Sequence, residues 1–253
     1  MRQSDMMLLV PQKLKEIEKE YGIRVLYAAE SGSRAWGTHT ESSDYDVRFI
    51  YIRPQEDYLR LDPVRDVLEF PIEDGWDMAG WDLMKMLQLL YSANSQIYEW
   101  FASPVVYMDD GFSQRIRPLL EAYFSVQTSV RHYLHQAERK WKQQQRAELT
   151  KVKQYLYGFQ HLASARWILA HRAPAPVSYQ EVIKWLPEDA ACRAREVLEL
   201  KSRQPLIPHD AWMDTWLEEE RERIVQQADQ LPKAPERSWD MLNRFFLAEL
   251  ERV

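Results

Sequence analysis

The residues whose types and spacing could do chemistry lie between positions 30 and 47, in the stretch ESGSRAWGTHTESSDYDV. Asp44 and Asp46 are one residue apart at the start of an apolar run, and alternation along a β-strand puts residues i and i+2 on one face. Two such carboxylates repel each other unless a positive charge lies between them, and hard oxygens suit Mg²⁺ or Mn²⁺. The pair therefore predicts a divalent-cation site, although for an isolated Asp-x-Asp two solvated acids in a turn would be the better interpretation.

Gly32 and Ser33 stand ten residues before this pair. A glycine lets the backbone approach a phosphate closely, and Ser33 supplies a hydroxyl and an N–H group, which we expect at a helix N-terminus. Together with the carboxylates, they predict a site for a metal-bound nucleoside triphosphate. Arg34 is either a phosphate contact or a surface residue, and Trp36 is either a stacking partner for a base or, more in line with its type, a core aromatic.

The surrounding pattern predicts strands first and helices afterwards. Apolar β-branched runs indicate strands at 23–29, 45–52, 67–72 and 75–80, with a loop at 54–62. Helical periodicity and proline breaks indicate helices at 8–20, 82–92, 95–102, 112–145, 150–172, 178–203, 208–230 and 237–251. This order is typical of an α+β fold, with a catalytic domain over 1–110 and a helical domain over 111–253 that binds nucleotide or acceptor.

Charge is distributed unevenly along the chain, whose formal net charge is −6. Residues 131–172 contain nine Lys and Arg against two acidic residues, whereas the segments on either side are acidic. Such a segment suits a nucleoside triphosphate or a nucleic-acid backbone, or else forms a solvated helix face that offsets the acidic segments.

The motif resembles a known signature. Gly-Ser followed after ten residues by Asp-x-Asp on a strand is similar to the DNA polymerase β-like nucleotidyltransferase superfamily. The run GSRAWG at 32–37 with SDYDVR at 43–48 resembles the predicted bacterial nucleotidyltransferases of the RlaP family, which is associated with RNA repair. Further similar segments are Gly80–Leu87, Asn94 to Pro104, Val152–Tyr157 and Ala165–Ile168.

The resemblance implies a mixed sheet with flanking helices, an all-helical C-terminal half, and transfer of a nucleoside monophosphate from a nucleoside triphosphate such as ATP. It implies that Asp44 and Asp46 bind two Mg²⁺ (or Mn²⁺) ions together with a third carboxylate. Asp77 aligns best with that third carboxylate, Glu69 is the alternative, and Asp82 is expected to cap a helix instead.

The resemblance also suggests which residues bind the nucleotide. Gly32, Ser33 and Arg34 would contact it from the catalytic half. A lysine of the helical half would contact the triphosphate, and of Lys140, Lys142, Lys151 and Lys153 we choose Lys153.

The acceptor is open at this stage. An RNA 3′-hydroxyl fits the basic segment and the association with RNA repair, and a protein or small-molecule acceptor fits the acidic overall charge. A non-catalytic, antitoxin-like module is the third alternative, and the intact motif argues against it. The single Cys192 excludes an internal disulfide, and the short apolar run at 6–10 matches neither a signal peptide nor a membrane span, so we expect a cytoplasmic protein. The oligomeric state does not follow from the sequence.

Overall fold

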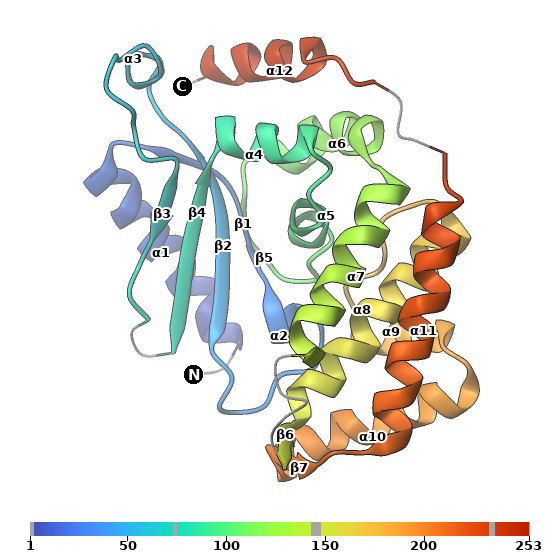
Figure 1. The fold of residues 1–253 in the computed structure, drawn as a ribbon. Helices are drawn as coiled ribbons and strands as arrows, with labels where there is room; N and C mark the ends of the chain where they lie inside the picture. Colours follow the sequence, from blue (N-terminus) through green and yellow to red (C-terminus); the bar gives the residue numbers. More distant parts are fainter. Residues whose placement is uncertain (1–2, 73–74, 143–147, 233–235, 253) are drawn as a thin grey trace. The chain divides into compact units, whose positions relative to one another are not determined.

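The computed structural model describes residues 3–72, 75–142, 148–232 and 236–252. The chain forms two compact units (Figure 1). The first comprises Met1–Ala35, Ser42–Tyr123 and Glu236–Val253, and the second comprises Trp36–Glu41 and Phe124–Pro235. The expected division into 1–110 and 111–253 therefore differs from the observed one, because helix α6 and the C-terminal helix α12 belong to the first unit.

The first unit is built on a five-stranded mixed sheet with strand order β3-β4-β2-β1-β5. β2 and β4 are parallel and the other neighbours are antiparallel. The strands are β1 Arg24–Glu30, β2 Tyr45–Ile52, β3 Val67–Glu69, β4 Trp76–Asp82 and β5 Val106–Asp109. The helices are α1 Gln3–Tyr21, α2 Gly32–Ala35, α3 Gln55–Tyr58, α4 Leu83–Tyr91, α5 Ser95–Phe101, α6 Phe112–Tyr123 and α12 Asp240–Leu250.

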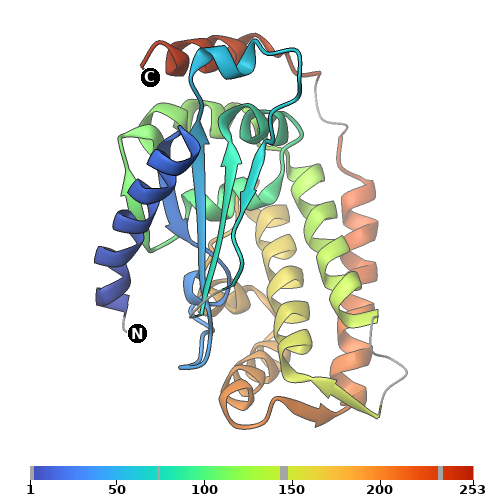
Figure 2. The ribbon, with the colours of Figure 1, turned by 90° about the vertical axis from the view of Figure 1, so that its left-hand side faces the viewer.

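Helix α1 covers one face of the sheet, and α4, α5 and α6 cover the other (Figures 1 and 2). The buried stripe of α1 follows helical spacing, with Met6, Val10, Leu14 and Ile17 all essentially inaccessible to solvent. The central strand β2 is buried on both faces over its second half, which explains why its sequence there is continuously apolar.

The contact between β2 and β4 requires a glycine. Gly80 pairs with Phe49 in the parallel register, and a Cβ atom at Gly80 would collide with the Phe49 ring. The ring of Phe49 is fully buried, so it cannot move aside into solvent. This glycine thus lets the two strands keep the register that positions the residues at their starts.

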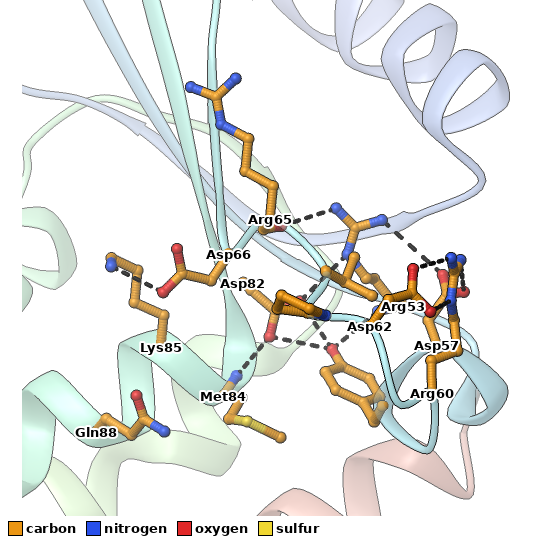
Figure 3. Close-up of a pocket in the computed structure, with 13 residues that line it drawn as sticks. Arg53, Asp57, Arg60, Asp62, Arg65, Asp66, Asp82, Met84, Lys85 and Gln88 are labelled. Atoms are coloured by element: carbon orange, nitrogen blue, oxygen red, sulfur yellow. Dashed lines mark hydrogen bonds and ion pairs between the residues drawn. The ribbon is translucent and has the colours of Figure 1, made fainter.

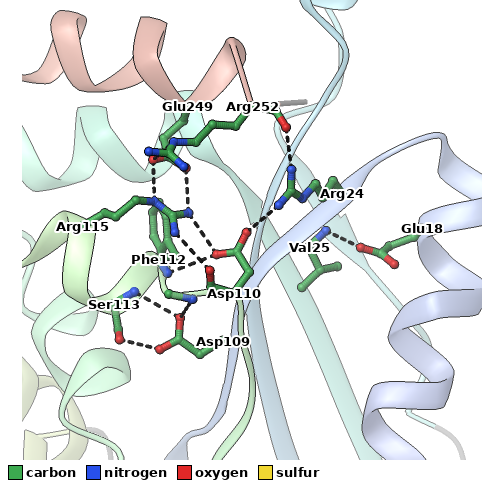
Figure 4. A network of polar contacts seen from close by, with 11 residues as sticks. Glu18, Arg24, Val25, Asp109, Asp110, Phe112, Ser113, Arg115, Glu249 and Arg252 are labelled. Atoms are coloured by element: carbon green, nitrogen blue, oxygen red, sulfur yellow. Dashed lines mark hydrogen bonds and ion pairs between the residues drawn. The ribbon is translucent and has the colours of Figure 1, made fainter.

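Charged groups hold the C-terminal helix on the first unit (Figure 4). Arg115 of α6 donates from Nε and Nη2 to the carboxylate of Glu249, at 2.7 and 2.9 Å, and from Nη2 to Asp110 at 2.9 Å. Arg24 donates to Asp110 and to the backbone carbonyl of Arg252. The Glu249 side chain is only 2% exposed, and Arg115 is its nearer cationic partner, with Arg252 at 3.6 Å from the same carboxylate.

The second unit is mostly helical and is organised around α8 (Val152–His171). Its other elements are α7 Val126–Lys142, β6 Leu149–Lys151, α9 Tyr179–Val182, the 3₁₀ turn η1 Ile183–Trp185, α10 Glu188–Arg203, β7 Leu206–Pro208 and α11 Ala211–Asp229. Thirteen residues of α8 are buried, because α7, α10, α11 and η1 pack around it. At Gly158 the absence of a side chain makes room for Leu217 of α11.

The expected fold class is confirmed: a mixed sheet with flanking helices is followed by a helical C-terminal half. The four expected strands are present, but β5, β6 and β7 were not anticipated because they have only three or four residues. The helix expected over 112–145 is two helices, since the Ser125 hydroxyl accepts a hydrogen bond from the Thr128 N–H and so caps a new helix. Residues 143–145 of that expected helix lie outside the described residues.

We predict that Arg115→Met lowers the free energy of unfolding by about 2–3 kcal/mol, because it removes the nearer cation from the buried Glu249 carboxylate and leaves it the longer contact with Arg252. Chemical denaturation monitored by circular dichroism measures this. The control is Arg60→Met, which removes an exposed ion pair with Asp62 and should cost no more than about 1 kcal/mol. Equal effects of the two substitutions would contradict this role of Arg115.

Candidate active site

Two carboxylates meet where β2 and β4 begin. The parallel register places Asp46 of β2 directly beside Asp77 of β4, and both side chains are half-buried. Asp44 precedes β2, is exposed, and has its Oδ1 close to Gly75, two residues before Asp77. The structure therefore brings Asp46 and Asp77 together and places Asp44 at the same end of the strands, outside this pair.

Arg48 is the counter-charge of this carboxylate pair. Its Nη2 donates to Asp77 Oδ2 at 2.8 Å and to Asp46 Oδ1 at 3.3 Å, and its Nη1 donates to Asp77 Oδ1 at 3.2 Å. Nη1 also donates to the backbone carbonyls of Val47 and Asp77, at 3.1 and 2.9 Å, which fixes the guanidinium in place. One cation thus serves two acids, and sequence reasoning did not single it out, although it stands two residues after Asp46 on the same face of β2.

The charge of the pair is only partly offset. The pKa of Asp46 is raised to about 6, chiefly by burial and also by the negative charges of Asp77 and Glu30, against the lowering effect of Arg48. Burial disfavours the ionised form of this carboxylate, and a bound cation would favour it. The site can therefore accept additional positive charge.

Gly32 allows the Asp46 side chain to occupy its position. Its φ of +57° lies in the left-handed region, and a Cβ atom there would collide with the Asp46 carboxylate. Ser33 follows in α2, a single turn of four residues, so it lies near a helix start as expected. Gly32 thus lies against the Asp46 carboxylate, and Ser33 is its neighbour in the chain.

A third acid, Glu30, holds the backbone of Asp46 in place. It ends β1 and is fully buried, and its Oε1 accepts a hydrogen bond of 2.8 Å from the Asp46 N–H. Tyr107 of β5 donates its hydroxyl to Glu30 Oε2, and the Ser103 hydroxyl donates to the Glu30 carbonyl at 2.6 Å. Burial raises the pKa of Glu30. Sequence analysis did not single out Glu30, and its position at the end of an apolar strand was the available signal.

Arg34 closes the loop that joins the two halves of the motif. Its Nε donates to the Asp44 carbonyl at 3.1 Å and its Nη2 to the Ser43 carbonyl at 2.8 Å. Its guanidinium lies 3.7 Å from the centre of the Tyr45 ring. Arg34 therefore has a structural task in this loop, and a contact with phosphate remains a prediction.

The remaining sequence-predicted residues lie elsewhere. Glu69 is exposed on β3 and pairs with Arg65. Asp82 caps α4 as expected, because its Oδ1 accepts a hydrogen bond from the Met84 N–H. Lys153 is exposed in the second unit, on the first turn of α8.

Trp36 belongs to the second unit and packs edge-on against Tyr157 and His161. Its carbonyl accepts a hydrogen bond from the Tyr179 N–H. These contacts fit the interpretation of Trp36 as a packing residue.

A second charged cavity, of about 280 Å³, lies at the opposite end of β2 and β4 (Figure 3). Arg53 follows β2 there, and Asp82 ends β4. Burial raises the pKa of Asp82 to about 6, and the Tyr58 hydroxyl donates to its carboxylate. The basic and acidic side chains that line this cavity pair with each other, as Lys85 does with Asp66, so it has no excess charge of one sign for a charged ligand.

The carboxylate pair fits a divalent cation by its donor chemistry. Asp46 and Asp77 supply hard oxygens from adjacent strands, and Arg48 sets one positive charge against their two negative charges. Within the described part of the chain, no group of three or more His, Cys, Asp or Glu side chains could hold a metal ion. The fit therefore rests on these two carboxylates, with room for substrate oxygens as further ligands.

A mixed sheet with Gly-Ser beside paired aspartates on adjacent strands defines this protein as polymerase β-like. The model of the RlaP family, described as the RNA repair pathway DNA polymerase beta family, matches residues 6–248, and the chain belongs to this family. The chain is also 35% identical over 247 residues to the Bacillus subtilis (strain 168) protein named "Uncharacterized protein YcgL", covering 95% of each chain. The family indicates a nucleotidyltransferase linked to RNA repair. None of the described helices has the length and apolar character needed to cross a membrane.

We predict that Asp77→Asn lowers the pKa of Asp46 from about 6 in metal-free buffer, because it removes a neighbouring negative charge. Carbon-13 NMR of the aspartate carboxyl groups during a pH titration measures this. Asp62→Asn, which removes an exposed acid of the same unit, should leave the pKa unchanged. An unchanged pKa in Asp77→Asn would mean that burial alone raises it.

Gly32→Ala tests the close approach of the backbone to Asp46. Gly22 is the matched control, because its φ of +62° is similar and a Cβ atom there meets nothing within 4 Å. Gly22→Ala should cost about 1–2 kcal/mol of unfolding free energy from backbone strain alone. Gly32→Ala should cost about 1–3 kcal/mol more because the Asp46 carboxylate must move. Equal losses in urea denaturation would rule out the collision.

Proposed function

We propose that this protein is a metal-dependent nucleotidyltransferase that transfers a nucleoside monophosphate from a nucleoside triphosphate to an RNA 3′-hydroxyl. The observation that carries the proposal is the pairing of Asp46 with Asp77 beside Gly32 and Ser33. Membership of a polymerase β-like family linked to RNA repair supports both the reaction class and the choice of acceptor.

Asp46 and Asp77 are the residues that would hold Mg²⁺ or Mn²⁺, and exposed Asp44 would join them as the third carboxylate of a two-metal site. When bound, the metal supplies positive charge that neutralises the triphosphate and makes the acceptor hydroxyl more acidic. Two ions are the expectation from the family, whereas the paired carboxylates by themselves account for one.

The chain's own groups would bind and orient the triphosphate. Gly32 exposes backbone at the edge of the carboxylate pair, and Ser33 adds a hydroxyl that can donate to a phosphate oxygen. Arg34 orders the segment between these residues and Asp44 by binding the Ser43 and Asp44 carbonyls. Glu30 holds the Asp46 backbone, so the carboxylate is positioned before substrate arrives.

Attack by the acceptor oxygen on the α-phosphorus would form the new phosphodiester bond and break the bond to the β-phosphate oxygen, releasing pyrophosphate. The proton of the acceptor hydroxyl has to leave in the same step. Asp77 would accept it, because its half-buried carboxylate lies beside Asp46 at the start of β4.

The test is incubation with each α-³²P-labelled nucleoside triphosphate and Mg²⁺, with total small RNA and cell protein offered as acceptors. We expect labelled RNA with the wild-type protein. Asp46→Asn and Asp77→Asn should reduce labelling on the order of 10²–10³-fold, since each removes charge stabilisation from the reacting phosphate. Asp62→Asn is the control and should retain full activity.

The other outcomes discriminate between acceptors and classes. Label in protein but not in RNA would mean that a protein side chain is the acceptor. A protein that binds no nucleoside triphosphate in equilibrium dialysis would not be an enzyme of this class, and a non-catalytic binding module would take the place of the proposal.

A further inference from the structure

The second unit contains a cavity of about 380 Å³ with an unusual charge. Of the described residues that line it, three are lysines and none is acidic. Lys151 ends β6, Lys153 lies in the first turn of α8, and Lys201 lies in the last turn of α10. Figure 1 shows β6, β7 and α10 gathered at one end of α8. The remaining lining is apolar and consists of Val152, Pro205 and Leu206.

Backbone pairing fixes the position of the lysines. β6 and β7 pair antiparallel, with Lys151 opposite Leu206, and the Val152 N–H donates to the Pro205 carbonyl at 3.0 Å. These contacts bind the start of α8 to the segment that follows α10. As a result, Lys153 and Lys201, which are far apart in sequence, line one cavity.

The cavity has an excess of positive charge. Lys201 is half-buried, and burial together with the charge of Lys153 lowers its pKa. The N-terminus of α8, a helix of 20 residues, adds partial positive charge at the same place. An anion in the cavity would relieve the repulsion between the ammonium groups, and a cavity of this volume is large enough for more than a single small ion.

We propose that this lysine cavity binds the phosphate backbone of the acceptor RNA strand. This inference rests on the proposed function, since it names where that enzyme holds its acceptor. The metal of a metal-bound triphosphate takes carboxylate ligands, and no described residue that lines the cavity is acidic. Lys153, expected from the sequence to contact the triphosphate, therefore serves the acceptor strand in this proposal. Phosphodiesters of a strand carry charge without such a metal, and the apolar wall suits the ribose and base attached to them.

Lys201 also connects the cavity to the motif loop. Its Nζ donates to the Thr38 carbonyl at 2.6 Å, and Thr38 belongs to the short segment 36–41 that runs between Gly32-Ser33 and Asp44. A phosphate of the acceptor strand that binds Lys201 would therefore contact a residue that also holds segment 36–41. Lys201 would thus both bind the acceptor and help to fix this segment.

The test measures binding of a fluorescein-labelled oligoribonucleotide of about 12 nucleotides by anisotropy over a range of salt concentrations. Lys153→Met and Lys201→Met are compared with Lys184→Met, which removes an exposed lysine of the same unit that is not among the residues lining the cavity. Each cavity variant should weaken binding about 5–10-fold and reduce the salt slope by about 0.7 for the lost phosphate contact. Binding of a fluorescent ATP analogue with Mg²⁺ should stay unchanged, and circular dichroism confirms folding. Because Lys153 is exposed, its replacement cannot disturb the core.

Three results would overturn the inference: no strand binding by the wild-type protein, equal losses in Lys184→Met and the cavity variants, or weaker binding of the ATP analogue in the cavity variants. The proposed function fails separately. Asp46→Asn should reduce transfer on the order of 10²–10³-fold and leave strand binding intact. If the wild-type protein transfers no nucleotide to RNA while the cavity variants still lose strand affinity selectively, the cavity assignment stands without the enzymatic one.

Discussion

The parallel pairing of β2 with β4 is the constraint on which the rest of the first unit depends. It sets Asp46 beside Asp77 at one end of the sheet, and two half-buried carboxylates in contact are unfavourable unless other groups compensate them. Arg48 offsets part of this charge and is held by two backbone carbonyls as well as by both acids. Arg48 offsets one of the two negative charges, so a cation that arrives with its substrate would offset the other.

The surroundings of the pair are built to keep Asp46 in place. Glu30 is a buried acid whose carboxylate accepts a hydrogen bond from the Asp46 N–H rather than pairing with a basic side chain. The Tyr107 hydroxyl donates to the same carboxylate, and the Ser103 hydroxyl donates to the Glu30 carbonyl. A buried carboxylate of this kind costs stability unless it is fully hydrogen-bonded. Because Glu30 holds the Asp46 backbone, its stability cost is offset by the positioning of the site, which is common at functional sites.

The sequence predicted the parts of this molecule that depend on local patterns. Helical spacing identified α1, apolar β-branched runs identified β1 and β2, and the cap formed by Asp82 followed from its place before an apolar helix. The contacts of Arg48 and Glu30 could not be predicted in this way, because each depends on which strands become neighbours. The same holds for Lys201, which reaches the cavity near Lys153 only through the pairing of β6 with β7, two strands of three residues each. The register of β2 on β4 is also non-local, so the choice of Asp77 over Glu69 rested on resemblance until the structure placed Asp77 beside Asp46.

Between Gly32-Ser33 and Asp44, the chain passes from the first unit to the second and back. Residues 36–41 belong to the helical unit, whereas Gly32–Ala35 and the residues from Ser42 onward belong to the sheet unit. In the sheet unit, Arg34 holds this segment by donating to the Ser43 and Asp44 carbonyls. In the helical unit, the Tyr179 N–H donates to the Trp36 carbonyl and Lys201 donates to the Thr38 carbonyl. All four of these acceptors are backbone carbonyls, so the loop's path is fixed whatever side chains it carries. Six of the ten residues between Gly-Ser and Asp-x-Asp, 36–41, thus belong to the helical unit, so the motif's interval is shared between the two units.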